Sequence, residues 1–215
     1  MERYQARFIE LALKHEALKF GQFTLKSGRI SPYFFNAGAF ASGATLAELG
    51  RCYADCIAAS GIEFDILLGP AYKGIPLAAA TAVALADHHD RDIPFAYNRK
   101  EAKTHGEGGQ LVGAPLEGRV LIIDDVITAG TAVSEVINLI QSAGATPVGV
   151  VIGLDRQERL DGHQSAVQTI QQRYDLDVAS IINFATLIDY VAQEGHTDRN
   201  LDQAMQDYRA QYGAQ

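Results

Sequence analysis

The chain has little that would place it in a membrane, on a nucleic acid or in the secretory pathway. No stretch comes near the roughly 18 consecutive apolar residues of a membrane-spanning helix. The N-terminus carries Glu2 and Arg3 in place of a basic segment followed by an apolar one. Lysine and arginine number 18 against 26 aspartates and glutamates, for a formal net charge of -8. We therefore expect a cytoplasmic protein without a general basic face for nucleic acid or anionic membranes.

Cysteine is equally scarce, and this scarcity excludes both a disulfide framework and a complete zinc site. Cys52 and Cys56 lie four residues apart in a helical pattern, and the chain has no other cysteine. Two free, partly buried thiols are expected. Internal repeats and low-complexity tracts are also missing, so a single domain over residues 1–215 is predicted.

What the chain does contain is an apolar run that ends in two adjacent carboxylates. Residues 120–123 are all apolar and three of the four are β-branched, which is typical of a strand buried on both faces. Asp124 and Asp125 follow where this strand should end. Ligands bind at that end of the strands in open α/β sheets, so we expect a binding site there.

The residues after these carboxylates have the composition of a phosphate-binding loop. Thr128 and Thr131 supply hydroxyls, Gly130 can adopt a positive φ, and a helix start would offer unpaired N–H groups. The lysine of the nucleotide-triphosphate loop GxxxxGKS or GxxxxGKT is missing. Adjacent carboxylates repel unless cations or hydroxyls satisfy them, and a ribose phosphate that carries Mg²⁺ offers both. The alternative is a solvated Asp-Asp turn with a threonine helix cap.

Strands and helices should alternate along most of the chain, which predicts an α/β fold with a mainly parallel, twisted sheet and helices on both faces. Strands are expected at residues 23–26, 33–35, 66–68, 94–97, 120–123, 147–154 and 178–182. Helices are expected at residues 2–19, 43–60, 77–86 and 131–143, then up to residue 174 and over 187–191 and 201–212. The first helix and first two strands would form a small N-terminal hood, mainly within residues 1–40, over the carboxyl edge of the sheet.

Two further loops carry cations. Residues 69–76 follow a short strand and hold Lys73 among two glycines and two prolines, which suits an anion site or a plain strand-to-helix connection. Residues 99–110 hold four cations among three glycines: Arg99, Lys100, Lys103 and His105. We favour a mobile lid that closes over a polyanion, against the alternative of a solvated surface loop.

Arg156 and two phenylalanines complete the candidate site. Arg156 follows a predicted strand, where its guanidinium could grip a planar carboxylate or pair with Asp155 or Glu158. Phe34 and Phe35 would point to opposite faces of an extended segment. Periodicity alone places both of them in the core.

These segments resemble the type I phosphoribosyltransferase family, and in particular its orotate-specific members. The resemblance covers nearly the whole chain and is carried by Lys26 and by residues 33–35, 69–76, 97–109, 120–132 and 155–158. It implies transfer of ribose 5-phosphate from phosphoribosyl diphosphate (PRPP) to N1 of orotate in pyrimidine (UMP) biosynthesis. The products would be orotidine 5'-monophosphate and pyrophosphate. Departures from the family pattern lie elsewhere, notably at residues 160–164 and in the C-terminal helices.

The resemblance also implies roles for individual residues. Catalytic roles are implied for Lys103, His105, Asp124 and Asp125. PRPP binding is implied for Lys26, Tyr72, Lys73, Arg99, Lys100, Lys103, His105, Asp124, Asp125, Val126, Ile127, Thr128, Ala129, Gly130, Thr131 and Ala132. Orotate binding is implied for Phe34, Phe35, Thr128 and Arg156.

Mg²⁺ is the expected cofactor, held mainly by substrate oxygens and water. A homodimer is implied, in which Lys100, Lys103 and His105 of the lid reach the neighbouring site. Two other functions are alternatives on the same fold. A non-catalytic PRPP-sensing regulator is opposed by the acidic charge and the intact lid, and a purine-specific transferase by Arg156 and the Phe34-Phe35 pair.

Overall fold

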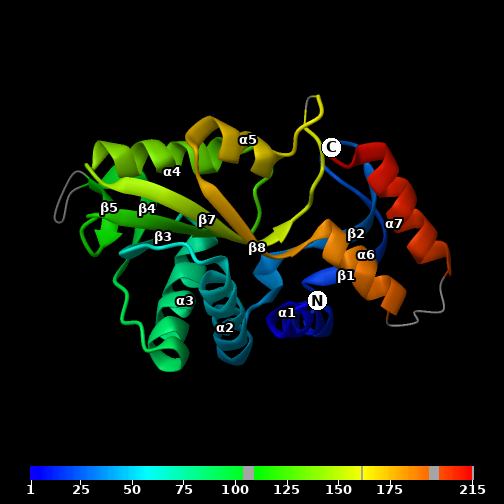
Figure 1. Cartoon of the computed structure of the whole chain (residues 1–215), viewed down its shortest axis with the longest axis horizontal. Helices are drawn as coiled ribbons and strands as arrows, with labels where there is room; N and C mark the ends of the chain where they lie inside the picture. Colours follow the sequence, from blue (N-terminus) through cyan, green and yellow to red (C-terminus); the bar gives the residue numbers. More distant parts are fainter. Residues whose placement is uncertain (104–108, 161, 194–198, 215) are drawn as a thin grey trace.

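A central β-sheet organises the molecule in the computed structural model, which describes residues 1–103, 109–160, 162–193 and 199–214. Within these residues the sheet has six strands in the order β5-β4-β3-β6-β7-β8 (Figure 1). Their bounds are Ile66–Gly69 (β3), Phe95–Lys103 (β4), Gly109–Gly113 (β5), Arg119–Asp124 (β6), Thr146–Asp155 (β7) and Asp177–Asn183 (β8). All pairs are parallel except β4 with β5. The predicted mainly parallel sheet is confirmed.

Helices cover both faces of this sheet. Gly43–Ser60 (α2) and Gly74–His89 (α3) lie on one face, while Thr131–Ser142 (α4) and Ala166–Tyr174 (α5) lie on the other (Figure 1). Two apolar clusters fill the space between the layers, one on each face. The strands contribute to both clusters because successive side chains alternate between faces. None of the helices in the described ranges combines the length and apolarity needed to cross a membrane.

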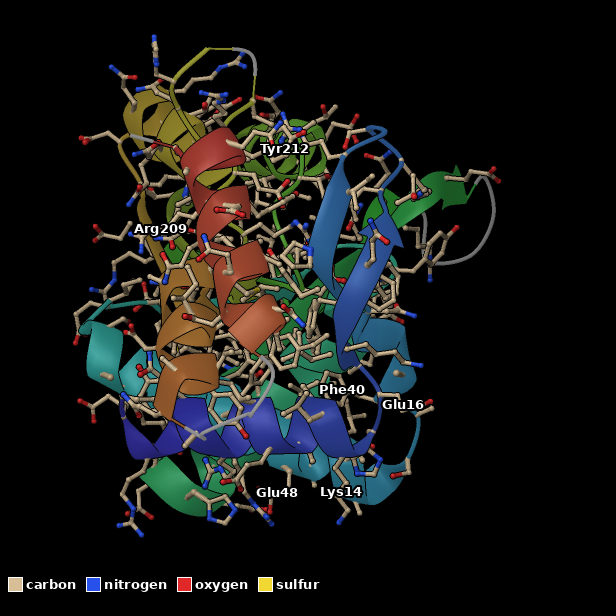
Figure 2. The ribbon with its side chains drawn as sticks, turned by 90° about the vertical axis from the view of Figure 1, so that its right-hand side faces the viewer. Lys14, Glu16, Phe40, Glu48, Arg209 and Tyr212 are labelled. Carbon is tan, nitrogen blue, oxygen red and sulfur yellow. The ribbon has the colours of Figure 1, made fainter. Side chains whose placement is uncertain are left out.

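The remaining elements gather at one end of the sheet. They comprise Arg3–Lys14 (α1), the antiparallel hairpin of Leu18–Thr24 (β1) and Ile30–Phe35 (β2), Ala37–Ala39 (η1), Phe184–Gln193 (α6) and Arg199–Tyr212 (α7). Figure 2 shows α7 running alongside the hairpin, with Arg209 and Tyr212 near its end. The C-terminal helix and the N-terminal hairpin therefore form one unit, although the sequence separates them widely.

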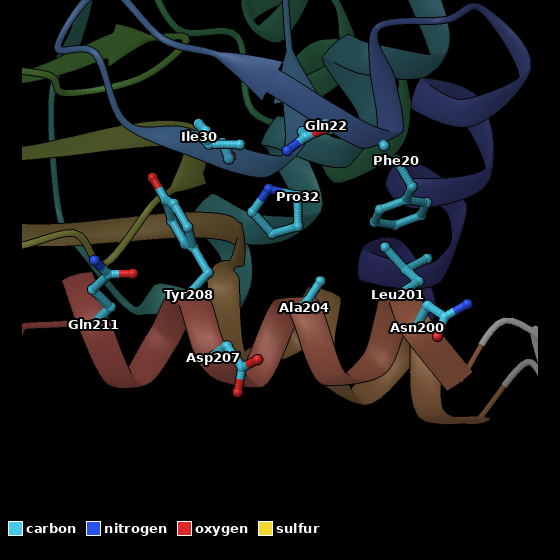
Figure 3. Close-up of a pocket in the computed structure, with 12 residues that line it drawn as sticks. Phe20, Gln22, Ile30, Pro32, Asn200, Leu201, Ala204, Asp207, Tyr208 and Gln211 are labelled. Atoms are coloured by element: carbon cyan, nitrogen blue, oxygen red, sulfur yellow. The ribbon is translucent and has the colours of Figure 1, made fainter.

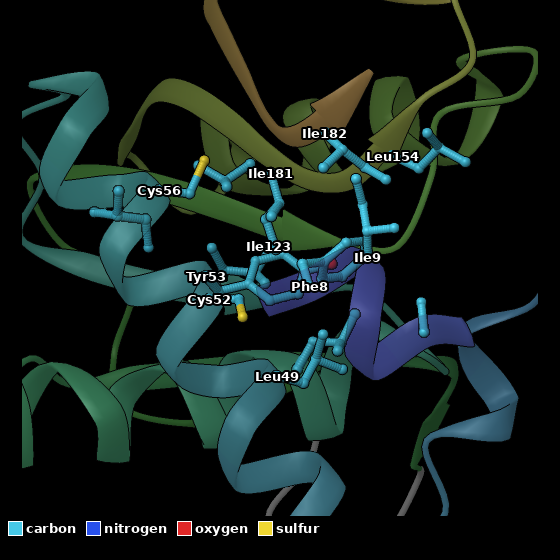
Figure 4. Packing of buried hydrophobic residues seen from close by; sticks show 14 of the residues in the cluster. Phe8, Ile9, Leu49, Cys52, Tyr53, Cys56, Ile123, Leu154, Ile181 and Ile182 are labelled. Carbon is cyan, nitrogen blue, oxygen red and sulfur yellow. The ribbon is translucent and has the colours of Figure 1, made fainter. Parts of the chain in front are cut away.

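Aromatic and aliphatic side chains join α1 and α2 to the sheet. Phe8 and Ile9 of α1 meet Leu49 and Tyr53 of α2 in a fully buried cluster (Figure 4). Both cysteines lie in α2, are buried and remain free thiols, as the sequence predicted. Burial raises the pKa of Cys56 to about 12, so its thiol stays protonated at neutral pH.

The helix α2 covers the predicted residues 43–60, and a local signal marks each of its ends. The Ser42 hydroxyl accepts a hydrogen bond from the backbone N–H of Thr45, and Gly61 closes the helix in the left-handed conformation with φ +70°. The first helix is shorter than expected. It ends at Lys14, and Glu16 adopts φ +56°, which interrupts the helical path before β1 begins.

Two predicted loops are more regular than expected. The helix α3 begins at Gly74 rather than residue 77, and its first turn accommodates Pro76 because N–H groups there have no intrahelical partner. Residues 99–103 belong to β4 and residues 109–110 to β5, so both described ends of the expected 99–110 loop are strand, and residues 104–108 fall outside the described part of the chain. Its glycines and charges concealed the antiparallel strand, which lacks an alternating apolar pattern.

Gly50 marks a close approach of α2 and α3, and we expect its replacement by alanine to destabilise the fold. A Cβ at this position would lie 2.5 Å from the carbonyl oxygen of Ala80. The Gly50→Ala variant should force the helices apart and lower the free energy of unfolding by about 1–3 kcal/mol, measured by urea denaturation. The Gly43→Ala variant is the control, because a Cβ there meets no atom within 4 Å. Equal stability of the two variants would contradict this tight contact.

Candidate active site

Most of the predicted site residues follow the carboxyl ends of three neighbouring strands. The strand β3 ends at Gly69, β6 at Asp124 and β7 at Asp155. Since β6 pairs in parallel with both β3 and β7, these three ends meet at one edge of the sheet. The two carboxylates, the predicted phosphate-binding loop of residues 126–132 and Arg156 all lie at or just beyond this edge.

Two glycines allow the start of α3 to lie directly against the ends of β3 and β6. A Cβ on Gly69 would lie 2.2 Å from the carbonyl oxygen of Gly74, and one on Gly74 would lie 2.7 Å from that of Ile123. Neither position has room for a side chain. This approach brings Lys73 to the end of β6, where its Nζ lies 2.6 Å from Oδ2 of Asp125.

The two adjacent aspartates have different environments. Asp125 is buried and forms the ion pair with Lys73, whereas the Oδ1 atom of Asp124 accepts a hydrogen bond of 2.9 Å from the backbone N–H of Asp125. Burial and the neighbouring charge of Asp125 raise the pKa of Asp124 to about 7. One carboxylate therefore pairs with a lysine, while the other can take up a proton near neutral pH.

Backbone contacts fix the position of this aspartate pair. The Tyr53 hydroxyl donates to the carbonyl oxygen of Asp124 at 2.8 Å. The carbonyl oxygen of Asp125 accepts from the N–H groups of Gly153 at 2.9 Å and Leu154 at 3.3 Å. Helix α2 and strand β7 thus hold the chain from opposite directions at the point where β6 ends.

The loop after the aspartates leads into α4 through a glycine that no other residue would replace easily. Gly130 adopts φ +77° and is the N-cap of α4. Thr128 and Ala129 before it, and Thr131 and Ala132 after it, are exposed. The first backbone N–H groups of a helix have no intrahelical partner and carry partial positive charge. The loop can therefore bind an anion through exposed amides and hydroxyls.

Strand β4 brings cations to the loop that follows β3. The Nζ atom of Lys100 lies 5.0 Å from the centre of the Tyr72 ring, and the Oδ1 atom of Asn98 accepts from the N–H of Ala71 at 2.9 Å. Arg99 has a buried Nη1 atom for which the described residues provide no hydrogen-bond partner. Such a donor has a strong tendency to bind an acceptor from a ligand.

Arg156, just beyond β7, is held by a carboxylate and by an aromatic ring. Its Nε and Nη2 atoms lie 2.8 Å and 2.5 Å from Oε1 of Glu158, and its guanidinium carbon lies 4.6 Å from the centre of the Tyr33 ring. Pairing with Glu158 was one of the two alternatives that the sequence left open. It orients the guanidinium without excluding a further carboxylate, since five N–H donors are available.

The two hairpin phenylalanines face different surroundings. Phe35 packs against Phe8 and Phe40, with ring centres 6.1 Å and 6.5 Å apart, whereas Phe34 is 39% exposed. The expectation that both belong to the core is therefore wrong for Phe34, because the strand turns it to the opposite side. Lys26 is exposed in the turn between β1 and β2, and no hydrogen bond, ion pair or ring contact among the described residues joins it to another predicted site residue.

Two predicted catalytic groups fall outside the described part of the chain. They are His105 and the side chain of Lys103, of which only the backbone, at the end of β4, is described. Conversely, several residues that hold the site were not identified as site residues from the sequence: Arg29, Tyr53, Asn98 and Tyr208. Tyr53 has the periodicity of any core residue, and the other three act through contacts with residues distant in the sequence. The sequence indicates Glu158 only as a possible partner of Arg156, two residues away.

Within the described ranges, no group of three or more His, Cys, Asp or Glu side chains could hold a metal ion. Asp124 and Asp125 could contribute one or two oxygens to a magnesium ion that arrives with a phosphorylated substrate. Mg²⁺ is commonly bound in this way, by few carboxylates together with substrate phosphates and water. The residues present therefore fit a substrate-bound ion better than a resident one.

The chain is similar to phosphoribosyltransferases in both sequence and fold. The model of the phosphoribosyl transferase domain family matches residues 40–189. The orotate phosphoribosyltransferase of Cellvibrio japonicus is 60% identical over 215 residues, which is 100% of both chains, and that of Thioalkalivibrio sulfidiphilus is 60% identical over 99% of this chain and 100% of its own. The crystal structure of orotate phosphoribosyltransferase from Francisella tularensis is 47% identical, with a TM-score of 0.88 over 96% of this chain and 99% of that chain.

The raised pKa of Asp124 should make the stability of the protein depend on pH. With a pKa of about 7 in the fold and about 4 in the unfolded chain, the folded state binds this proton more tightly. The resulting stabilisation is complete below about pH 4 and is lost as the pH rises through about 7. Between about pH 5 and about pH 8 this group should lower the free energy of unfolding on the order of 2 kcal/mol.

Urea denaturation of the Asp124→Asn variant at both pH values tests this expectation. The variant should lose less stability than the wild type over the same interval, since the titrating group is gone. Asp87→Asn is the matched control, because it removes an exposed carboxylate from the surface of α3. An unchanged pH dependence in Asp124→Asn would contradict the raised pKa.

Proposed function

The chain belongs to the phosphoribosyltransferase family, as an orotate phosphoribosyltransferase, and we propose that its reaction takes place at the carboxyl edge of β3, β6 and β7. Its activity is transfer of the ribose 5-phosphate group from PRPP to orotate in pyrimidine biosynthesis, with release of pyrophosphate. The observation that carries this conclusion is 60% identity to an orotate phosphoribosyltransferase over the full length of both chains. The aspartate pair beside a helix start supports the location.

The loop before α4 is proposed to bind the 5'-phosphate of PRPP. A phosphate would accept hydrogen bonds from the first N–H groups of α4 and from the hydroxyls of Thr128 and Thr131. The positive end of the helix dipole favours the anion in addition. The residues proposed for this contact are Val126, Ile127, Thr128, Ala129, Gly130, Thr131 and Ala132.

Asp124 and Asp125 are proposed to bind the ribose. Their oxygens can accept hydrogen bonds from the 2'- and 3'-hydroxyls, and their negative charge lies where the ring becomes positive as pyrophosphate departs. The C1–O bond to pyrophosphate breaks, N1 of orotate forms the new bond to C1, and the proton on N1 is lost. The pKa of Asp124 is raised to about 7, so this group is partly protonated near neutral pH. A positive centre bound beside it would lower that pKa and favour the charged carboxylate.

Cations on the loop after β3 and on β4 are proposed to bind the pyrophosphate group. Lys73 is already beside the aspartates, and Arg99 has a buried N–H group that a phosphate oxygen would satisfy. The proposed set comprises Lys26, Tyr72, Lys73, Arg99 and Lys100. Lys103 and His105 complete it from the sequence alone, as a lid that would exclude water from a hydrolysable substrate and stabilise the leaving group.

Orotate is proposed to bind between the hairpin and the end of β7. Arg156 would bind the carboxylate of the base, a contact for which a guanidinium is well suited. The exposed ring of Phe34 can lie against the pyrimidine, whereas Phe35, packed on the core, would contribute mainly through its backbone. Thr128 is proposed to contact the base as well as the phosphate.

Mg²⁺ is proposed as the cofactor, where it would neutralise diphosphate charge. Asp124 and Asp125 are the residues proposed to contact it, directly or through water. A homodimer, in which lid residues of one subunit reach the site of the other, and a cytoplasmic location remain predictions from the sequence. So does the single domain of residues 1–215 with its hood in residues 1–40.

Turnover of orotate tests the proposal directly. When the protein is mixed with PRPP, Mg²⁺ and orotate, the absorbance of orotate should fall and pyrophosphate should be released. Both changes should be much slower in a sample without Mg²⁺. Adenine, guanine and hypoxanthine as competing bases should give no nucleotide. PRPP binding without turnover of any base would support the non-catalytic regulator. Turnover of a purine would support the purine-specific transferase.

Replacement of Lys103 tests the lid. The Lys103→Ala variant should lose about 100-fold or more in kcat with an unchanged fold, because a cation that acts on the leaving group stabilises the transition state. The same variant should keep the circular dichroism and unfolding midpoint of the wild type. Normal turnover in a folded variant would refute the assignment of Lys103 to the lid.

A further inference from the structure

Glu158 connects Arg156 to two elements that are distant in the sequence. Its Oε1 atom accepts from Nε and Nη2 of Arg156 and, at 2.9 Å, from the hydroxyl of Tyr208 in α7. Its Oε2 atom lies 3.4 Å from Nη1 of Arg29, in the turn between β1 and β2. The side chains of Arg156 and Glu158 are only 16% and 14% exposed. The guanidinium is therefore held in place by a carboxylate that is itself held from two sides.

The hydroxyl of Tyr208 has a fixed position because its ring is fixed by packing. Tyr208 is 4% exposed, and its ring meets Phe184 edge-on at 5.8 Å and Tyr212 at 5.0 Å. It lines a cavity of about 490 Å³ between the hairpin and α7, and Figure 3 shows it pointing from the helix toward the hairpin near Ile30. Burial and the charge of Glu158 raise the pKa of Tyr208 to about 12, so the hydroxyl remains a donor at neutral pH.

The charges of this group leave one positive charge for a ligand. Two guanidinium groups, those of Arg29 and Arg156, face the single carboxylate of Glu158. The Tyr33 ring lies against the Arg156 guanidinium and stacks on Phe184 at 5.1 Å, so the guanidinium has an apolar support on that side. A substrate carboxylate would neutralise the remaining charge in a half-buried setting, where the attraction is stronger than in water.

We propose that Tyr208 and Glu158 are positioning residues for the substrate base. Tyr208 holds the carboxylate of Glu158, and Glu158 holds the guanidinium of Arg156 in the orientation that recognises the carboxylate of orotate. The inference rests on the proposed binding of that carboxylate by Arg156. It makes the selection of a 6-carboxylated pyrimidine depend on the C-terminal helix, which provides no proposed substrate contact of its own.

The Tyr208→Phe variant isolates this effect because it keeps the ring and removes only the hydroxyl. We expect the KM for orotate and the dissociation constant of orotidine 5'-monophosphate to rise about fivefold to tenfold. The KM for PRPP and the dissociation constant of uridine 5'-monophosphate should stay within about twofold. This second nucleotide differs only by the missing carboxylate, so a loss of general structure would weaken both nucleotides alike and would overturn the proposal.

Three further variants make the outcome decisive. Tyr212→Phe removes a hydroxyl one turn further along α7 and should leave both nucleotides unaffected. Glu158→Asp keeps the charge but shortens the side chain, and it should weaken orotidine 5'-monophosphate selectively, as Tyr208→Phe does. If neither Tyr208→Phe nor Glu158→Asp changes the ratio of the dissociation constants of orotidine 5'-monophosphate and uridine 5'-monophosphate, the proposal is wrong.

Arg156→Ala separates a failure of this proposal from a failure of the proposed function. If the two dissociation constants become equal only in Arg156→Ala, the proposed binding of the carboxylate by Arg156 stands and only the positioning role of Tyr208 and Glu158 is refuted. An unchanged ratio in Arg156→Ala would refute the role of Arg156 in orotate binding, and the role of Tyr208 and Glu158 with it.

Discussion

The contact of the α3 start with the ends of β3 and β6 is the constraint on which the site depends. Gly69 and Gly74 have no room for a Cβ, and only their close approach lets Lys73 reach Asp125. The same approach sets the loop of residues 70–73 beside β4 and its cations. The close packing of these two glycines therefore determines where Lys73 meets Asp125. This ion pair in turn determines the charge at the sheet edge.

The ion pair also divides the work of the two aspartates. Lys73 neutralises Asp125, while Asp124 stays half-buried without a cation in direct contact among the described residues, which explains its raised pKa. A positive centre bound nearby offsets the free-energy cost of ionising Asp124 beside Asp125. The protonation state of the pair therefore depends on the charge of the bound ligand. This property suits a reaction in which a sugar ring becomes transiently positive.

The second half of the site is built from the two ends of the chain. The hairpin provides Tyr33 and Arg29, α7 provides Tyr208, and all three converge on the residues that follow β7. The proposed phosphate loop would need only local backbone geometry, whereas the proposed recognition of a base would need side chains held at defined angles. This difference accounts for the use of distant elements on the proposed base side of the site.

The sequence by itself determined the elements and motifs that local chemistry encodes. Burial of residues 120–123, the Ser42 cap and the start of α4 at Gly130 follow from periodicity and backbone preferences, which act over a few residues. Only the tertiary structure decided that Arg99 lies in a strand, that Phe34 faces away from the core, and that the Glu158 carboxylate paired with Arg156 also accepts a hydrogen bond from Tyr208. Those outcomes depend on contacts between residues up to 50 positions apart, which leave no periodic trace in the chain.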